Sequence, residues 1–559
     1  MFGQGVYKAL ALAVCLIGNG LARAELCTNS STAINGKPFP PLIEANLEDL
    51  VKGLESGLFT SVDLVNAYIA RIEEVNPTLK MVIAVNPDAL AIAADLDLAR
   101  ANGTDYGPLH GIPILIKDNI ATADKMDNTA GSYALVGAKV PEDSTMAAKL
   151  RKAGAVILGK TNLSQWANYR SSNSSNGWSA VGGQTEAAYY PKQDPSGSSS
   201  GSGVASSLGL ALASLGTETD GSILSPSNLN NLVGIKPTVG LTSRYLVVPI
   251  SEHQDTVGPM ARSVKDAAYV LSAIAGLDAK DNYTSAIPCK IPDYVKSCDY
   301  FALAGKRIGV PRNMINPSRS PSLAPILPAF NAALEVLRAA GATIVDDLTL
   351  PGYGPATQED FEDIVLKADF ITNLAGYMSK LTVNPHNITS VATLQAFTQS
   401  YPLEAWPQRD TLIWESALNL TYGNESPFFW GNYTSQLYYS GPLGIIGALK
   451  NYSLDALIVP TAVASTLPAQ IGSPVVTVPL GKLPANTTVV KNRFGNLVAR
   501  APNVPFGISF MGAHFSEAKL IGLAYAYEQR TLVRNTIVPY IQPKTELVDV
   551  VAKRQKDLR

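Results

Sequence analysis

The sequence predicts an α/β fold with a buried sheet, organised as one large domain. Helical segments alternate along the chain with short, wholly apolar runs, which are typical of strands covered on both faces. Of the 559 residues, 46% are hydrophobic and only 16% are charged, a composition that suits a large core. Neither an internal repeat nor a flexible linker divides the chain.

Apolar spacing predicts the elements in the first half of the chain. A helical segment is expected over 47–75, with Thr60 or Ser61 as an N-cap within it. The run 209–215 is either a tightly packed strand or a buried helix end, because periodicity does not separate the two in so short a run. The other expected elements are buried strands over 111–116, which ends at Lys117, and 155–158, and helices over 89–101, 144–153 and 226–232.

The second half repeats the α/β pattern around a region of different composition. Residues 350–450 are richer in aromatic residues and glycosylation sequons, and we interpret them as a variable insertion on the substrate side. Ordinary helix packing is the alternative explanation for any single aromatic residue there. The expected elements are strands over 307–310, 343–345, 457–459, 475–478 and 508–510, and helices over 328–340, with Pro328 at the first helical position, and 516–530, the closing helix.

The first 24 residues have the pattern of a secretory signal peptide. Lys8 supplies a positive flank, residues 9–18 form a short apolar segment, and Ala22-Arg-Ala24 is an A-x-A cleavage site before Glu25. The apolar segment is too short for a membrane anchor, so a secreted protein is expected. The expected divisions after the signal are an N-terminal segment over 25–46, a main domain over 47–530 and a C-terminal tail over 531–559.

Sequons agree with secretion, and their density after residue 380 favours a glycosylated surface there. Asn162 also lies in a sequon, but it follows a strand-like run and is expected to be buried. The remaining sequons are at Asn29, Asn102, Asn173, Asn282, Asn387, Asn419, Asn424, Asn432, Asn451 and Asn486.

Cysteine use and charge exclude several classes of function. Cys15 leaves with the signal, and a local disulfide between Cys289 and Cys298 would leave Cys27 unpaired. No Cys/His cluster indicates a metal. The formal net charge of −2 and the lack of a basic stripe argue against a nucleic-acid partner. Beyond the signal, no apolar stretch is long enough for a transmembrane helix.

Two short motifs match known patterns by chance. The stretch from Gly154 to Thr161 fits G-x-x-x-x-G-K-T, but a phosphate-binding loop needs converging backbone N–H groups, and its x positions here are the strand-like AVIL. The stretch from Ser516 to Lys519 fits S-x-x-K, but it is better explained as a solvated helix start with Ser516 as the N-cap.

The stretch DPSGSSSGSG over 194–203 has three interpretations. It is a flexible linker by composition, or a nucleophile elbow with Ser199 as the nucleophile, or a rigid, buried loop that carries catalytic hydroxyls. The elbow is disfavoured because prolines interrupt the segment that should be its preceding strand. It would also need one of the downstream histidines, His253, His386 or His514.

A strand-borne lysine favours the third interpretation. Burial of Lys117 would lower its pKa, so that the neutral amine could act as a base through the serine hydroxyls. The apolar run 209–215 leads to a turn over 216–222, in which Gly221 allows a tight bend. Backbone N–H groups there could converge on an oxyanion, with Ser222 just before the next helix.

These residues lie in blocks that resemble the amidase signature family, closest to its branch of bacterial peptide amidases and plant and fungal relatives. The resemblance runs from about residue 47 to about residue 530 and implies a mixed central β-sheet covered by helices on both faces. The blocks are LHGIPILIKDN (109–119), GKTNLSQWAN (159–168), DPSGSSSGSG (194–203), GTETDGSILSPS (216–227), VGIKPTVGL (233–241), DTVGPMARSVKDAA (255–268), DALIVPT (455–461) and PFGISFMG (505–512).

The resemblance implies a role for each matched position. Lys117 would be the base. Ser198, which follows a cis peptide bond in the family, would bridge to the nucleophile Ser222, and Ser199 would hydrogen-bond within the loop. The oxyanion hole would be the backbone of Thr219, Asp220, Gly221 and Ser222. No metal and no organic cofactor are implied.

Substrate and class stay open within this resemblance. Glu218, Asp220 and Leu224 depart from the pattern D-T-G-G-S-I-R of many members, which puts the usual supporting contacts in doubt. They also do not match the subunit of tRNA-dependent amidotransferases. A peptide C-terminal amide is the first substrate hypothesis, followed by a fatty or aryl amide and an amide of a secondary metabolite. An inactive binding protein and a Ser-His esterase acting through Ser199 are the alternatives of other classes.

Overall fold

The computed structural model describes residues 33–34 and 37–557. The expected signal peptide with Cys15, the mature N-terminus at Glu25, and the residues Cys27 and Asn29 lie outside this part of the chain. Within it, no helix is long and apolar enough to cross a membrane.

An eleven-stranded sheet runs through the centre of the described chain. In spatial order its strands are β12 (Thr343–Leu348), β11 (Arg307–Pro311), β13 (Ala456–Pro460), β17 (Pro505–Met511), β14 (Val475–Lys482), β9 (Val233–Lys236), β10 (Thr256–Ala261), β8 (Ala213–Glu218), β4 (Pro113–Lys117), β5 (Val156–Thr161) and β3 (Val82–Val85). Parallel pairs join β12, β11 and β13 at one end of the sheet and β8, β4 and β5 toward the other, and the remaining pairs, including β5 with the edge strand β3, are antiparallel, so the sheet is mixed, as expected.

Three two-stranded sheets lie outside it in the described chain: β1 (Ala33–Ile34) with β2 (Lys37–Pro38), β6 (Trp178–Ser179) with β7 (Gly183–Gln184), and β15 (Val490–Lys491) with β16 (Val498–Arg500).

Helices cover both faces of the central sheet, which confirms the predicted architecture. One group contains α5 and α6, which pack on each other and on the central strands. A second group contains α7, which packs on α4, α16 and the same strand β10 that α5 contacts. The helices are α1 (Leu47–Glu55), α2 (Ser61–Leu79), α3 (Ala89–Ala101), α4 (Thr145–Lys152), α5 (Ser200–Ser207), α6 (Leu224–Leu229), α7 (Val264–Ile274), α8 (Leu327–Ala339), α9 (Tyr353–Gln358), α10 (Phe361–Met378), α11 (Val391–Ser400), α12 (Leu412–Leu418), α13 (Pro427–Ser440), α14 (Ile445–Asn451), α15 (Thr466–Ile471), α16 (Glu517–Thr531) and α17 (Leu547–Asp557).

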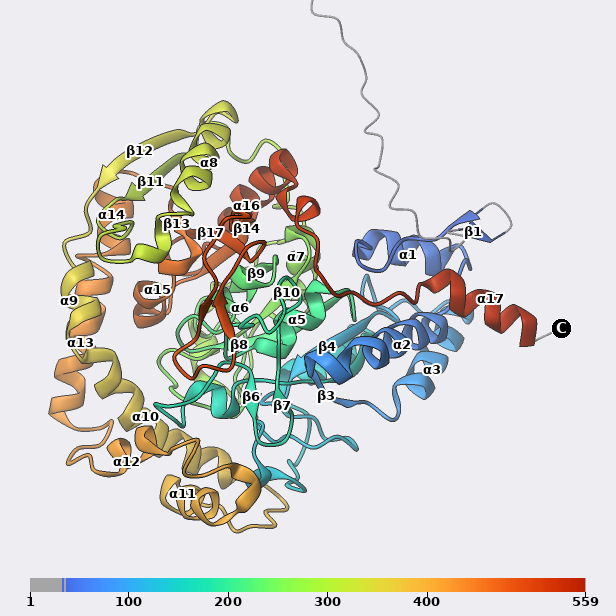
Figure 1. The fold of residues 1–559 in the computed structure, drawn as a ribbon, viewed down its shortest axis with the longest axis horizontal. Helices are drawn as coiled ribbons and strands as arrows, with labels where there is room; N and C mark the ends of the chain where they lie inside the picture. The colour runs from blue at the N-terminus through green and yellow to red at the C-terminus, as the bar shows by residue number, and fades with distance from the viewer. Residues whose placement is uncertain (1–32, 35–36, 558–559) are drawn as a thin grey trace, which may run out of the picture.

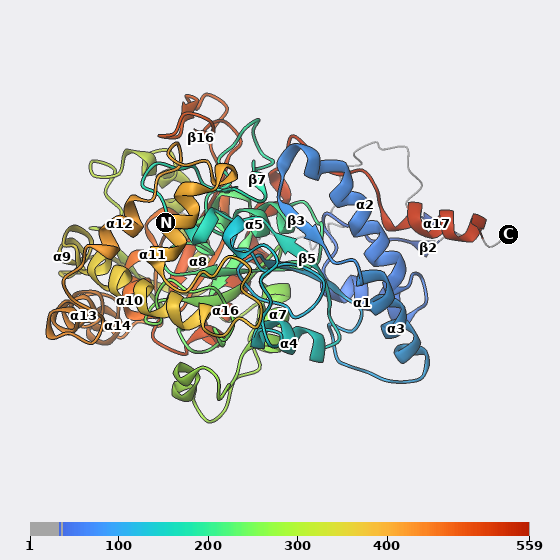
Figure 2. The same ribbon diagram turned by 90° about the horizontal axis from the view of Figure 1, so that it is seen from below.

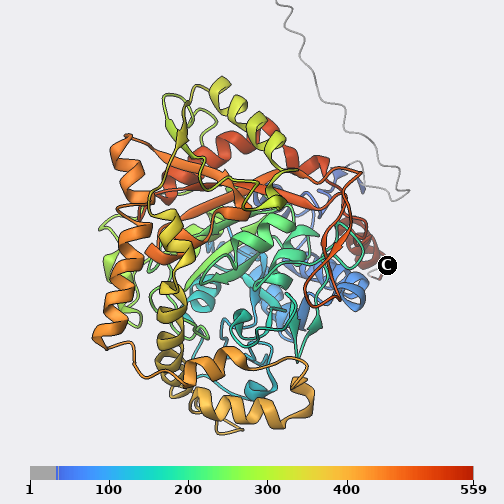
Figure 3. The same ribbon diagram turned by 60° about the vertical axis from the view of Figure 1, so that its left-hand side comes forward.

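The helices of residues 353–451 gather on the side of the molecule opposite α2, α3 and α17 (Figures 1 and 2). Figure 3 shows the yellow and orange helices of this region along two edges of the molecule. Trp414 and Phe429 are buried in it, whereas Phe428 and Trp430 are about half exposed. Core packing therefore explains some of the aromatic residues in this region and leaves others at the surface.

Several predicted elements end differently in the structure. The segment 47–75 forms two helices, α1 and α2, because the first helix ends at Glu55 and Thr60 caps the start of the second. The run 209–215 is a strand only from Ala213, and the expected turn over 216–222 begins after Glu218. The helix predicted over 226–232 starts earlier, at Leu224, and Pro328 is the second residue of α8. A further helix, α17, follows the expected closing helix and packs on α2.

Some details of local chemistry also differ from the predictions. Cys289 and Cys298 are free thiols, so the expected local disulfide is absent. Ser516 occupies the N-cap of α16, but its hydroxyl donates to the carbonyl of Ala513 instead of capping. Asn162 is fully buried, as predicted, and its amide donates to Thr185 and to backbone carbonyls.

The Gly/Ser stretch is not a flexible linker. Its second half is the start of helix α5, which corrects the expectation of a loop throughout, and residues from Ser198 onward are fully buried. The helix can approach its neighbours closely because Gly201 lacks a side chain. A methyl group there would lie 2.2 Å from the Met81 carbonyl oxygen and 2.6 Å from the Asn162 nitrogen.

Gly201→Ala should therefore lower the free energy of unfolding by about 3 kcal/mol, because the methyl group overpacks a site walled by backbone. The matched control is Gly431→Ala in α13, where no atom lies within 4 Å of the added methyl group. That control should raise stability by about 0.5–1 kcal/mol through helix propensity. Urea unfolding measures both, and equal stability of the two variants would contradict the packing assignment.

Candidate active site

Lys117 lies at the end of β4 in the interior of the molecule, with a side chain that is fully buried. Its Nζ atom is 2.7 Å from Ser198 Oγ and 3.0 Å from Ser199 Oγ. On the neighbouring strand β8, Thr217 contributes Oγ1 at 2.8 Å and its carbonyl oxygen at 3.2 Å. The amine is thus surrounded by neutral oxygen atoms.

Burial lowers the pKa of Lys117 to about 7. The cause is desolvation, which penalises the ammonium form, while the carboxylates of Asp255 and Glu218 oppose it from a distance. No carboxylate forms an ion pair with Lys117 within the described residues. A large fraction of the amine is therefore neutral near pH 7, as its predicted role as a base requires.

The structure places Ser198 and Ser199 between Lys117 and the loop after β8. The peptide bond between Gly197 and Ser198 is cis, as the resemblance implies. Ser199 donates its hydroxyl to the carbonyl of Thr217 on strand β8 at 3.1 Å. The expectation that the Ser199 hydroxyl bonds within its own loop is therefore wrong. The Ser199 N–H donates to the carbonyl of Ser222 at 3.2 Å, which joins the two serine-bearing segments.

Ser222 lies directly before α6, at the end of a tight turn. Gly221 has a positive φ of 79°, which favours glycine, and its carbonyl accepts the Ser225 N–H at 2.7 Å. In the part of the chain that the structure describes, no hydrogen bond joins the hydroxyls of Ser198 and Ser222. The two are instead brought together through the backbone contact with Ser199.

The predicted oxyanion hole has free donors. No acceptor among the described residues takes the N–H groups of Asp220, Gly221 and Ser222. The Thr219 hydroxyl donates to Asp255 Oδ1 at 2.6 Å, and Asp255 Oδ2 accepts the N–H groups of Ile250 and Ser251. These contacts fix the turn while leaving its amides unpaired, and unpaired, preorganised amides are the groups that stabilise an oxyanion.

Glu218 takes over a supporting role that the sequence left in doubt. Its Oε2 accepts the N–H groups of Ile223 at 2.7 Å and Leu224 at 2.9 Å, immediately after Ser222. The residue is buried, and desolvation raises the pKa of its carboxyl group while Lys236 opposes the shift. Glu218 therefore anchors the backbone on the far side of Ser222 from Asp255.

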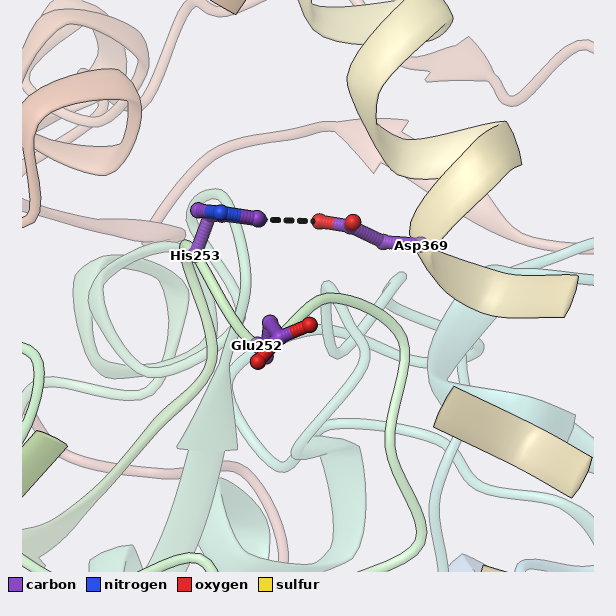
Figure 4. Close-up of side chains that lie close together, drawn as sticks. All are labelled: Glu252, His253 and Asp369. Atoms are coloured by element: carbon purple, nitrogen blue, oxygen red, sulfur yellow. Dashed lines mark hydrogen bonds and ion pairs between the residues drawn. The ribbon is translucent and has the colours of Figure 1, made fainter. Parts of the chain in front are cut away.

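The Ser-His alternative fails because the histidines lie elsewhere. His253 Nδ1 is 2.7 Å from Asp369 Oδ2, on helix α10 (Figure 4). His514 contacts the carbonyl of Ile471, and the His386 ring packs at a tilt against Phe397. Ser199, the nucleophile of that alternative, bonds to Lys117 and to a backbone carbonyl instead.

Glu252, His253 and Asp369 offer ligand atoms within 4.8 Å of one another, a geometry that could hold a metal ion. Asp369 is already committed, however, because Ser251 donates to its Oδ2 at 2.6 Å and Asn424 to its Oδ1 at 3.2 Å. Aromatic rings surround His253, the nearest being Tyr433 with a centroid distance of 4.4 Å. We interpret the cluster as a structural hydrogen-bonded pair.

The sequence patterns indicate the lysine and the serines but not the residues that hold them. Thr217 binds the amine, Asn119 donates to Thr217 Oγ1 at 3.0 Å, and Asp255 supports the turn. All three lie in sequence blocks that carry the family resemblance. Their spacing gave no signal, because each acts on a residue that is distant in the chain.

Comparison with known proteins places this geometry in a family. A family model described as Amidase matches residues 63–521. A putative amidase of Arthroderma benhamiae is 53% identical over 92% of this chain and 90% of its own length. A probable amidase of Arabidopsis thaliana is 37% identical over 88% of this chain and 91% of its own. The native peptide amidase of Stenotrophomonas maltophilia superposes with a TM-score of 0.80 at 39% identity, covering 90% of this chain and all of that one.

Glu218→Ala should lower the free energy of unfolding by about 2–4 kcal/mol, because it leaves the buried N–H groups of Ile223 and Leu224 without an acceptor. Glu218→Gln is the control, since it loses the same charge near Lys236 but keeps an acceptor oxygen, and it should cost less than half as much. Chemical denaturation measures both variants. A loss that is the same for Ala and Gln would show that the anchoring hydrogen bonds contribute little.

Proposed function

Because the chain belongs to the amidase signature family, and is thus a hydrolase of amide C–N bonds, we propose that Lys117, Ser198 and Ser222 form its catalytic triad. The observation that carries the proposal is the fully buried Lys117 amine, which is bonded to Ser198 and has no carboxylate partner among the residues that the structure describes. A buried amine with a pKa of about 7 has the properties of a general base at neutral pH.

Catalysis begins with proton transfer from Ser222 to Ser198 and from Ser198 to the neutral amine of Lys117. The Ser222 oxygen then attacks the amide carbonyl carbon and forms a tetrahedral intermediate. A small movement of the Ser222 hydroxyl toward Ser198 completes the relay, since catalytic hydrogen bonds often tighten only when the substrate binds.

The free N–H groups of residues 220–222 stabilise the negative charge on the former carbonyl oxygen. Collapse of the intermediate breaks the C–N bond, and Ser198 donates a proton to the leaving ammonia or amine while Lys117 returns its own to Ser198. Water then repeats the sequence on the acyl-enzyme, which releases the acid and restores Ser222.

We propose peptide C-terminal amides as the substrate class. Support comes from the peptide amidase of Stenotrophomonas maltophilia, which matches this fold over its full length at 39% identity. The residues of the proposed triad are contributed by the end of β4, the segment just before α5 and the β8–α6 turn.

We also propose that the protein is secreted and N-glycosylated. Exposed sequon asparagines support this, including Asn173, Asn282 and Asn419, whereas the buried Asn162 is not available for modification. A mass decrease on treatment with an N-glycosidase, for protein recovered from the culture medium, is the expected observation. Unmodified protein retained in the cell would contradict it.

A fluorophosphonate probe should label Ser222 and no other serine of the proposed site. Ser222→Ala should abolish both labelling and hydrolysis, while Ser199→Ala, which loses one hydrogen bond to Lys117, should slow labelling about tenfold or less. Peptide mapping by mass spectrometry identifies the labelled residue. Labelling at Ser199 would support an esterase, and a folded protein that is not labelled would favour an inactive binding protein.

The rate constant kcat/KM should rise with pH through the pKa of Lys117 at about 7 and level off above it. The sign follows because only the deprotonated amine accepts a proton, so below pH 7 activity falls about tenfold per unit. Lys117→Arg keeps the cation but cannot act as a base, and it should lose about 10²–10⁴-fold. A profile that is flat between about pH 5 and 9 would contradict the assignment of Lys117 as the base.

A further inference from the structure

A small cavity lies beside the Gly/Ser stretch over 194–203, which we call the serine loop below. Two arginines line the cavity, and its lining includes no acidic side chain. Its lining includes Asn168, Arg170, Ser174, Trp178 and Arg409, and its volume is about 20 Å³. That space admits about one water-sized group, such as a single oxygen of a carboxylate.

Arg409 is a buried cation that has no carboxylate partner in the described part of the chain. Its side chain is enclosed, with the residue 7% exposed, and its Nη1 donates only to the hydroxyls of Ser174 at 3.2 Å and Ser175 at 3.1 Å. No described residue accepts a hydrogen bond from its Nε or Nη2 atoms. Burial and the nearby Arg170 lower its pKa to about 10, so the guanidinium stays charged at neutral pH.

The two neighbouring acids, Glu404 and Asp410, form their hydrogen bonds with residues other than Arg409. Glu404 pairs with Arg170 at 2.9 Å and accepts three further hydrogen bonds from Ser132, Tyr133 and Gln165. Asp410 accepts from Ser172 and from the Leu412 N–H. Arg170 also keeps its buried Nε without an acceptor. Two guanidinium groups thus present unused donors around one cavity.

Aromatic rings hold the Arg409 guanidinium in place. It lies 3.6 Å from the ring centroid of Phe494 and 4.7 Å from that of Trp178, and Arg170 lies over the same indole at 5.7 Å. Stacked guanidinium groups lose little freedom on binding an anion, because their planar fork is already oriented. This is the chemistry of a preformed carboxylate site.

Asn168 connects the cavity to the proposed triad. It follows two residues that share its positive φ, Trp166 and Ala167, and this left-handed turn brings its side chain against the serine loop. A methyl group added to Gly197, the residue before Ser198, would lie 2.9 Å from Asn168 Nδ2. The cavity is therefore adjacent to the serine loop and is not a remote surface feature.

We propose that Arg409, with Arg170, forms a subsite for a carboxylate group of the substrate, so that the enzyme favours amides that carry an acidic group. This inference rests on the proposed amide hydrolysis and specifies its substrate class. Charge-assisted hydrogen bonds to a desolvated guanidinium discriminate strongly against a neutral isostere, because the isostere leaves the buried donors without an anionic acceptor.

The test compares peptide amides that differ only in glutamate or glutamine at one position, scanned over the two residues nearest the amide. At the responsive position, kcat/KM should be about 10- to 100-fold higher for glutamate. Arg409→Gln should remove this preference, because kcat/KM should fall at least about tenfold more for the glutamate peptide than for the glutamine peptide. The matched control is Arg530→Gln, which should keep the preference. Arg530 lies on α16, and its guanidinium is 3.8 Å from the ring centroid of Tyr300.

Three outcomes overturn the proposal: no preference for glutamate in the wild type at either position, equal losses for both peptides in Arg409→Gln, or loss of preference in Arg530→Gln. If Arg409→Gln does not fold, Arg409→Lys retains the charge without the planar fork. It should lower the preference for glutamate at least about threefold, and an unchanged preference also overturns the proposal.

A binding measurement separates this inference from the proposed function. Calorimetric titration with succinate should detect millimolar binding to the wild type and at least about tenfold weaker binding to Arg409→Gln. Failure of all amide hydrolysis with binding intact would contradict the proposed function alone. Equal binding by the two proteins, or none to either, would contradict the carboxylate subsite.

Discussion

The buried amine of Lys117 is the constraint on which the rest of the site depends. A charged ammonium in this position would pay a large desolvation cost, and no carboxylate among the described residues pairs with it to offset that cost, so the structure favours the neutral form. The surrounding oxygens of Ser198, Ser199 and Thr217 suit that form, because a neutral amine both donates and accepts hydrogen bonds. The same burial that is unfavourable for stability produces a base that operates near neutral pH.

The fold supplies this environment from segments that are far apart in the sequence. Parallel strands β4 and β8 bring Lys117 beside Thr217, and the segment just before α5 places two serines against both. The turn after β8 is held at its two sides by Asp255 and Glu218, which leaves its amides free. Rigid strands and fixed hydrogen bonds therefore achieve the preorganisation that stabilisation of an oxyanion requires.

The sequence predicted what local patterns encode. Strands β4 and β5 each begin with an apolar run, over 113–116 and 156–158, and a lysine at the end of such a run signals a buried amine. The sequence could not show that the Gly/Ser stretch becomes a helix, because the support for α5 comes from packing of Gly201 against distant backbone. Likewise, Arg409 lies about 200 residues after Ser198, and nothing in its neighbourhood in the chain indicates that it reaches the serine loop.

The most direct test of the central claim is the protonation state of Lys117 itself. Neutron diffraction from crystals at about pH 8.5 should show two hydrogen isotopes on Nζ, with the Ser198 hydroxyl donating to it, and crystals at about pH 5.5 should show three. Three hydrogen isotopes on Nζ at the higher pH would mean that the amine stays charged despite its burial, and the account of Lys117 as the base would be wrong.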